Sequence, residues 1–170
     1  MNNIKYLFIL IVMFGVGLGL LGLFNPNTEI EVEEGIIAPL RETWDVFNDT
    51  SSWKHWKIQD GELEWTSGRP GKEGTQYTII RSPEVEVEVS IIESHIDSLL
   101  ILESKYSDGT SKVSSIGFAI ENGQTMVSHK EILSTTGFLQ RVNLSFNRSS
   151  IEKQTEEQLE ALKVYMEKGE

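Results

Sequence analysis

The chain contains no cysteine, which excludes disulfide bridges, thiol nucleophiles and metal sites that use thiolate ligands. Basic residues are also scarce, because 15 lysines and arginines stand against 26 aspartates and glutamates, for a net charge of −11. A domain that binds nucleic acid needs a basic face to meet the phosphates, so this balance argues against a nucleic-acid partner. It also argues against a domain that lies flat on anionic lipid.

Several sequence motifs of enzymes are missing as well. The chain has no Walker-type phosphate loop, no dinucleotide fingerprint of glycines and no nucleophile elbow around a serine. Its three histidines, His55, His95 and His129, share no helix face and no short ligand spacing, so we expect no metal site and no cofactor. The residues therefore specify no reaction on their own.

A long apolar run is present over residues 6–24, and it contains no charged residue. A helix of that length spans about 28 Å, close to the thickness of the hydrocarbon core of a bilayer. A cleaved signal peptide would have a shorter apolar region and a small-x-small cleavage site, which residues 22–26 do not supply. The run therefore predicts a retained, single-pass transmembrane anchor over residues 1–24, with the membrane as a partner through residues 6–24.

The charges on either side of this run indicate its orientation. Lys5 precedes the run and several glutamates follow it within residues 29–34, so the positive-inside tendency places the domain on the extracytoplasmic side. Residues 25–29 are expected to form a short hinge, and residues 30–170 a single domain. A domain of about 140 residues has an ordinary size and can bury a core of its own.

Alternation of apolar and polar residues predicts a sheet. In residues 85–93 the valines and Ile91 fall on one face while Glu86, Glu88 and Ser90 fall on the other, which is typical of an antiparallel sheet with one buried face. Turn residues between the runs, such as Asn-Gly at residues 122–123, predict hairpins. The expected strands cover residues 28–37, 61–66, 75–81, 85–93, 98–106, 112–121 and 124–134.

Helical spacing of apolar residues predicts three helices. Pro39 suits the first turn of a helix over residues 39–48, in which Trp44 is expected to pack in the core. A short helix follows over residues 52–56, and a long one over residues 138–168 carries an apolar stripe that must be buried. The order of elements predicts an α+β fold, in which the long C-terminal helix lies on the concave face of a curved antiparallel sheet.

Residues 37–49, with the sequence IAPLRETWDVFND, and the W-K-H-W of residues 53–56 resemble the opening motifs of the START/polyketide-cyclase superfamily, also called SRPBCC. The chain is most similar to the membrane-anchored bacterial branch, and Thr43 departs from the usual valine. The resemblance implies a helix-grip fold of about seven strands, preceded here by the transmembrane helix. It also implies an apolar cavity between sheet and long helix, in which relatives bind lipids, sterols, polyketides or other hydrophobic ligands.

The resemblance implies a membrane-tethered binding module for a hydrophobic or lipid-like small molecule. The cavity is expected to be lined by inward positions of the strands and of the last helix, namely Val85, Val87, Val89, Ile91, Phe118, Phe138, Val142 and Phe146. The alternative is a cyclase or dehydratase that acts on a hydrophobic substrate, with His129 as the first candidate for the base. A third possibility is a structural or regulatory domain with a filled cavity, and we prefer binding over catalysis.

Two pairs of polar residues share a strand face in the sequence: His129 with Glu131, and Glu93 with His95. Polar residues that alternate along a one-sided sheet usually face water, so we expect both pairs to be solvated. An apolar lining of the cavity would favour binding alone, whereas two or three polar groups that converge inside it would favour the enzyme.

Overall fold

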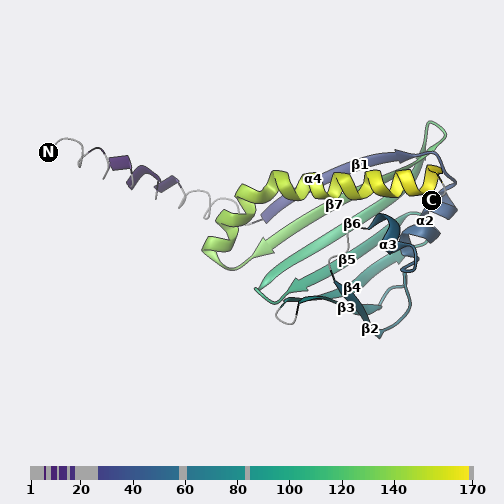
Figure 1. The fold of residues 1–170 in the computed structure, drawn as a ribbon, viewed down its shortest axis with the longest axis horizontal. Helices are drawn as coiled ribbons and strands as arrows, with labels where there is room; N and C mark the ends of the chain where they lie inside the picture. The colour runs from purple at the N-terminus through teal and green to yellow at the C-terminus, as the bar shows by residue number, and fades with distance from the viewer. Residues whose placement is uncertain are drawn as a thin grey trace.

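The computed structural model describes residues 27–57, 61–82 and 85–168, together with scattered residues between 6 and 17. The domain is a curved antiparallel sheet of seven strands with one long helix packed on its inner side (Figure 1). The strands are β1 (Asn27–Ile36), β2 (Glu62–Ser67), β3 (Gln76–Ser82), β4 (Val85–His95), β5 (Leu99–Tyr106), β6 (Thr110–Glu121) and β7 (Gln124–Thr135). The helices of the domain are α2 (Leu40–Asn48), α3 (Trp53–Trp56) and α4 (Phe138–Lys168).

The sheet has the strand order β1-β7-β6-β5-β4-β3-β2. Strands β2 to β7 therefore form a meander in chain order, and β1 closes the other side by pairing with β7. At the turn between β6 and β7, Asn122 and Gly123 both adopt positive φ angles, of 51° and 81°. The Asn-Gly hairpin was predicted for this reason, because these two residue types tolerate that backbone conformation.

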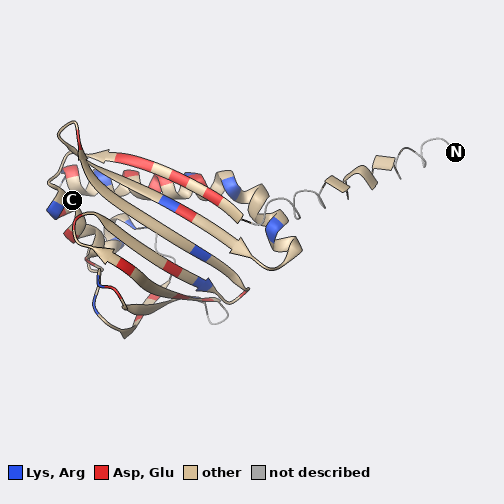
Figure 2. Cartoon of the chain, turned by 180° about the vertical axis from the view of Figure 1, so that it is seen from behind, with Lys and Arg blue, Asp and Glu red and all other residues tan. Residues whose placement is uncertain are grey.

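Alternation along the strands sorts their side chains between the two faces of the sheet. On β4 the inward residues Val87, Val89 and Ile91 are 3–4% exposed, while Glu86 and Glu88 are exposed. Seen from behind, the sheet carries acidic and basic positions separated by uncharged ones along several strands (Figure 2). The one-sided antiparallel sheet expected from residues 85–93 is thus present.

Helices α2 and α3 close one end of the inner face with aromatic residues. The ring centroids of Trp44 and of Phe118 on β6 lie 5.2 Å apart in an edge-to-face arrangement, and those of Phe47 and Phe118 lie 5.4 Å apart. The indole nitrogen of Trp53 donates a hydrogen bond to the carbonyl of Phe47 at 2.8 Å, and Trp56 lies 5.3 Å from the Phe47 ring. The aromatic residues of the sequence motif therefore build the core and hold α3 against α2.

Helix α4 packs mainly along β1 and to a smaller extent on β7 (Figure 1). Its buried residues are Val142, Thr155, Leu159 and Leu162. Helix α4 lies over the β1 side of the sheet. The inner faces of β3, β4 and β5 are therefore covered by α2, by α3 and by the side chains of the strands themselves. That arrangement places the cavity described below.

The predicted transmembrane helix is wrong, and so is the single-pass membrane location derived from it. Among the described residues, no helix is long and apolar enough to cross a membrane. The other residues of the predicted anchor lie outside the described residues, and β1 begins at Asn27, within the expected hinge.

Candidate ligand cavity

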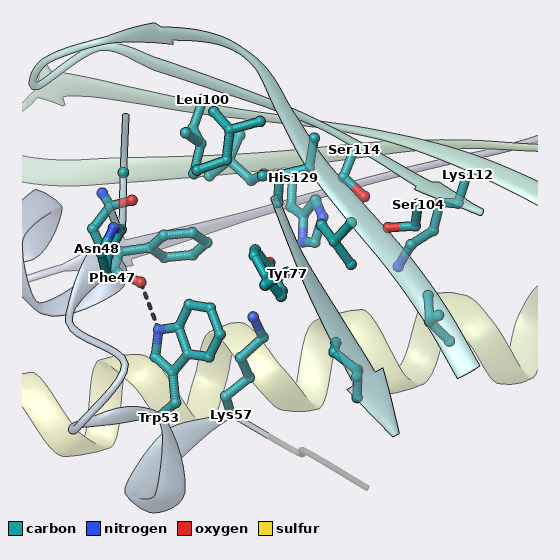
Figure 3. Close-up of a pocket in the computed structure, with 18 of the residues that line it drawn as sticks. Phe47, Asn48, Trp53, Lys57, Tyr77, Leu100, Ser104, Lys112, Ser114 and His129 are labelled. Atoms are coloured by element: carbon teal, nitrogen blue, oxygen red, sulfur yellow. Dashed lines mark hydrogen bonds between the residues drawn. The ribbon is translucent and has the colours of Figure 1, made fainter. Parts of the chain in front are cut away.

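A cavity of about 140 Å³ lies between the inner face of the sheet and helices α2 and α3 (Figure 3). An engineered apolar cavity of about 150 Å³ in another protein holds one benzene molecule, so this space is the size of a single ring. Most of its wall is apolar and comes from α2, α3 and strands β3 to β6. This part of the wall includes Phe47, Trp53, Tyr77, Ile79, Val87, Val89, Ile91, Leu100, Leu102 and Ile116.

Ionisable groups from β6 and β7 line another part of the wall. The ammonium of Lys112 lies 2.7 Å from a carboxylate oxygen of Glu131, whose side chain is only 4% exposed. Ser114 stands opposite Glu131 in the register of the two strands, and its hydroxyl lies 3.5 Å from the same oxygen. The ladder between β6 and β7 thus brings an ion pair into the interior of the domain.

His129 lies two residues before Glu131 on the same inward face of β7. Its ring is 7% exposed, and Nε2 is 3.3 Å from the Glu131 carboxylate. Nδ1 has no hydrogen-bond partner in the described part of the chain, and Nε2 contacts the Glu131 carboxylate without meeting the geometry of a hydrogen bond. A buried polar group without a partner costs about 1–3 kcal/mol, so this imidazole is an available site for a hydrogen bond from another molecule.

The charges in this cluster influence one another. Burial acts to raise the pKa of Glu131, but the close approach of His129 and the positive charge of Lys112 outweigh it and lower that pKa to about 2. Burial likewise acts to lower the pKa of Lys112, and the Glu131 carboxylate outweighs it, so the pKa of Lys112 is raised. Both groups are therefore ionised at neutral pH, and their charges balance each other.

Lys57 faces the cavity from the opposite side, where it follows the last residue of α3. Its ammonium lies 3.4 Å from the centre of the Trp53 ring. Part of the side chain remains exposed, but Figure 3 shows the amine pointing between Trp53 and Tyr77 towards the sheet. Burial, with a smaller contribution from the positive charge of Lys112, lowers the pKa of Lys57 to about 7.

The structure separates the residues expected to line the cavity into three groups. Val87, Val89 and Ile91 line it, as does His129. Phe118 and Val142 are buried elsewhere, Phe118 beside Trp44 and Val142 on α4, and neither lines it. The remaining three, Val85, Phe138 and Phe146, are 39%, 43% and 64% exposed and lie outside the lining.

The two polar pairs behave differently from each other. His95 and Glu93 contact each other at 2.8 Å on the exposed surface, as expected. The prediction that His129 and Glu131 face water is wrong, because the pairing of β7 with β1 and β6 turns both side chains inward.

His55, the remaining histidine, stacks on Tyr165 outside the cavity. No cluster of three or more acidic or histidine side chains that could hold a metal ion occurs among the described residues.

The sequence patterns did not predict that Lys57, Lys112 and Glu131 line the cavity. A signal existed for Lys112, because it has the same parity along its strand as the apolar Ile116 and Phe118. No such signal existed for Glu131, since apolar residues occur on both parities of β7. The position of Lys57 depends on how α3 ends, which the local sequence does not determine.

Comparison with known proteins gives structural relatives only. No protein-family model and no curated protein matches the chain. DynU16, a protein from the dynemicin biosynthetic locus, superposes with a TM-score of 0.66 at 14% identity over 84% of this chain and 48% of its own. SA2116, a protein of unknown function from Staphylococcus aureus, gives a TM-score of 0.65 at 14% identity over 84% of this chain and 95% of its own.

CalU16 from Micromonospora echinospora gives a TM-score of 0.58 at 15% identity and covers 81% of this chain and 73% of its own. This chain thus spans about half the length of DynU16 and most of the other two. Identities this low carry information on the fold and do not show the membrane-anchored branch that the motif resemblance named. The chain has a helix-grip fold, a curved antiparallel sheet with a long C-terminal helix on its inner side, and it shares this fold with these structures.

Proposed function

We propose that the protein binds a small hydrophobic molecule with one polar end in the cavity between the sheet, α2 and α3. The observation that carries this proposal is the buried imidazole of His129, which lies in the wall of a largely apolar cavity without a hydrogen-bond partner in the described structure. Ligand sites in proteins typically combine apolar walls with a few polar groups that fix orientation. A polar atom of the ligand next to His129 would remove the cost of leaving the imidazole unsatisfied.

The size of the cavity narrows the ligand class. About 140 Å³ accommodates one ring, while pockets for drug-sized ligands measure roughly 300–1,000 Å³. A sterol or a fatty acid would require the cavity to enlarge by a movement of α3 or of the loop after β2. Single-ring compounds with one polar substituent are therefore the first ligands to test.

The test measures the melting temperature and the dissociation constant of the full-length protein with a panel of single-ring phenols, ketones and acids. Val87→Trp places an indole in the cavity and should abolish binding, because Val87 is 3% exposed and lines the cavity. Val85→Trp is the matched control on the same strand, since Val85 is exposed and lies outside the lining. Absence of binding across the panel would refute the proposal, and so would equal binding by the two variants.

A second candidate function is a cyclase or dehydratase activity, and the His129–Glu131 pair favours it. A carboxylate 3.3 Å from the imidazole stabilises the protonated ring that forms when His129 accepts a proton. Removal of the proton next to a substrate carbonyl is the step shared by such aldol-type and dehydration reactions. If the protein catalyses it, a bound single-ring ketone should exchange that proton for deuterium from solvent. His129→Gln should stop the exchange without abolishing binding, and exchange that persists in this variant would remove His129 as the base.

A further inference from the structure

The charges that line the cavity do not balance. The basic side chains in the lining are Lys57, Arg81 and Lys112, whereas the acidic one is Glu131. Glu131 is already paired with Lys112 at 2.7 Å. Arg81 is exposed, so water can solvate its charge. Lys57 is left as the partly buried cation whose amine points into the cavity, and no carboxylate in the described part of the chain is paired with it.

The surroundings of the Lys57 amine explain why its charge is poorly supported. The face of Trp53 lies 3.4 Å away and stabilises a cation only in part. The other titratable groups that line the cavity are Tyr77 and Arg81 on β3, Tyr106 on β5, Lys112 on β6, and His129 and Glu131 on β7. Lys54 and His55 on α3 itself are exposed, and α4 contributes the uncharged Gln158. Burial and Lys112 both act against the charge of Lys57, in keeping with its lowered pKa of about 7.

A partly buried ammonium that has no counter-ion among the described residues is costly, and a negatively charged group brought into the cavity would reduce that cost. The space for such a ligand is the size of one ring. A carboxylate suits the site better than a phosphate, because a phosphate presents more oxygens and more charge than one ammonium can satisfy. The apolar walls formed by Trp53 and Tyr77 are suited to the ring itself.

We infer that the ligand of this cavity is a single-ring aromatic carboxylic acid, whose carboxylate pairs with the Lys57 ammonium while its ring lies against Trp53 and Tyr77. The inference rests on the proposed ligand-binding function and adds the charge and class of the ligand: the carboxylate lies at Lys57, and a second polar substituent on the ring would be the group that meets His129. It assigns Lys57 as the residue that selects acids over neutral compounds of the same shape.

The experiment compares benzoate with benzamide, which is nearly the same size but uncharged, by calorimetric titration of the full-length protein. Wild-type protein should bind benzoate at least about tenfold more tightly than benzamide, since charge-assisted hydrogen bonds contribute about 1.5–3 kcal/mol. Lys57→Met should remove this preference and leave benzamide affinity within about twofold of wild type. Lys57→Arg, which keeps the charge, should retain the preference, and Lys54→Met on the exposed side of α3 should leave both affinities unchanged.

The affinity for benzoate should also depend on pH. Lys57 is protonated below about pH 7 and the carboxyl of benzoate is ionised above about pH 5. Benzoate should therefore bind most tightly between about pH 5 and pH 7, and its affinity should fall by up to about tenfold for each pH unit above 7. Benzamide should show no such decline. Equal affinities of wild-type protein for benzoate and benzamide, or an undiminished benzoate preference in Lys57→Met, would overturn the inference and leave ligand binding intact. Failure of both compounds to bind, together with the rest of the ligand panel, would overturn the proposed function as well.

Discussion

Replacement of Glu131 by glutamine should change how the stability of the fold depends on pH. The carboxylate is 4% exposed and is held by Lys112 at 2.7 Å and by the nearby His129 ring. Glutamine keeps the shape of the side chain but removes its charge. The substitution therefore isolates the electrostatic contribution of this one group, and it leaves Lys112 without its partner.

The magnitude follows from the lowered pKa. The pKa of Glu131 is about 2 in the folded protein against 4.5 for an ordinary glutamate, and this difference corresponds to roughly 3 kcal/mol of stability. A group whose pKa is lowered by folding stabilises the fold when it is ionised. The contribution is thus fully present above about pH 4.5 and is lost as the pH falls from 4.5 towards 2.

The assay is urea denaturation of wild-type protein and Glu131→Gln at pH 7 and at pH 3. Wild-type protein should be more stable at pH 7 by roughly 3 kcal/mol, and this gap should be about 2 kcal/mol smaller at pH 3. Glu29→Gln is the control, because Glu29 forms an exposed ion pair with Lys130 and such pairs contribute little. A gap for Glu131→Gln of the same size at both pH values would refute the reasoning.

Two further predictions concern the core and one tight turn. Trp44→Ala should lower the free energy of unfolding by about 3–5 kcal/mol, because Trp44 is 4% exposed and packs on Phe118. Trp65→Ala is the control and should lower this free energy clearly less, because Trp65 is 41% exposed. Equal losses in the two variants would contradict the prediction. Gly68→Ala should destabilise by at least about 1 kcal/mol more than Gly74→Ala in chemical denaturation. Both glycines have φ near 80°, so the backbone strain of an alanine is similar at the two positions. A Cβ at Gly68 would lie 2.7 Å from the backbone of Thr75, whereas a Cβ at Gly74 would meet no atom within 4 Å. Similar losses of stability in the two variants would show that the loop relaxes freely.

The strands and helices of the domain could be predicted from local patterns because each pattern is strong. The alternation around Val87 and Val89 decides which face of β4 is buried, and Asn122-Gly123 supplies backbone angles that a hairpin needs. The aromatic residues of α2 and α3 lie at helical spacing and form the core, as expected. In each case a few neighbouring residues contain enough information to determine the structure.

The cavity could be predicted only in part, because its composition depends on strand pairing across the whole sheet. His129 and Glu131 look like solvent-facing residues in their own strand, and only the register with β1 and β6 turns them inward. Phe138 and Phe146 lie in the apolar pattern of α4, yet the helix buries Leu159 and Leu162 instead. Hydrophobic spacing identifies a helical face without showing which part of that face the sheet will cover.

The two outer strands of the sheet, β1 and β2, bear on how copies of this protein meet. An unpaired strand edge offers backbone groups to a strand from another molecule, and this is a common route to fibrillar aggregation. Here β1 carries exposed carboxylates at Glu29, Glu31 and Glu33, and β2 carries them at Glu62 and Glu64. Pairing of either edge with the same edge of a second copy, or of one edge with the other, would bring rows of like charges together. The acidity of the chain therefore also protects its sheet from growing beyond seven strands.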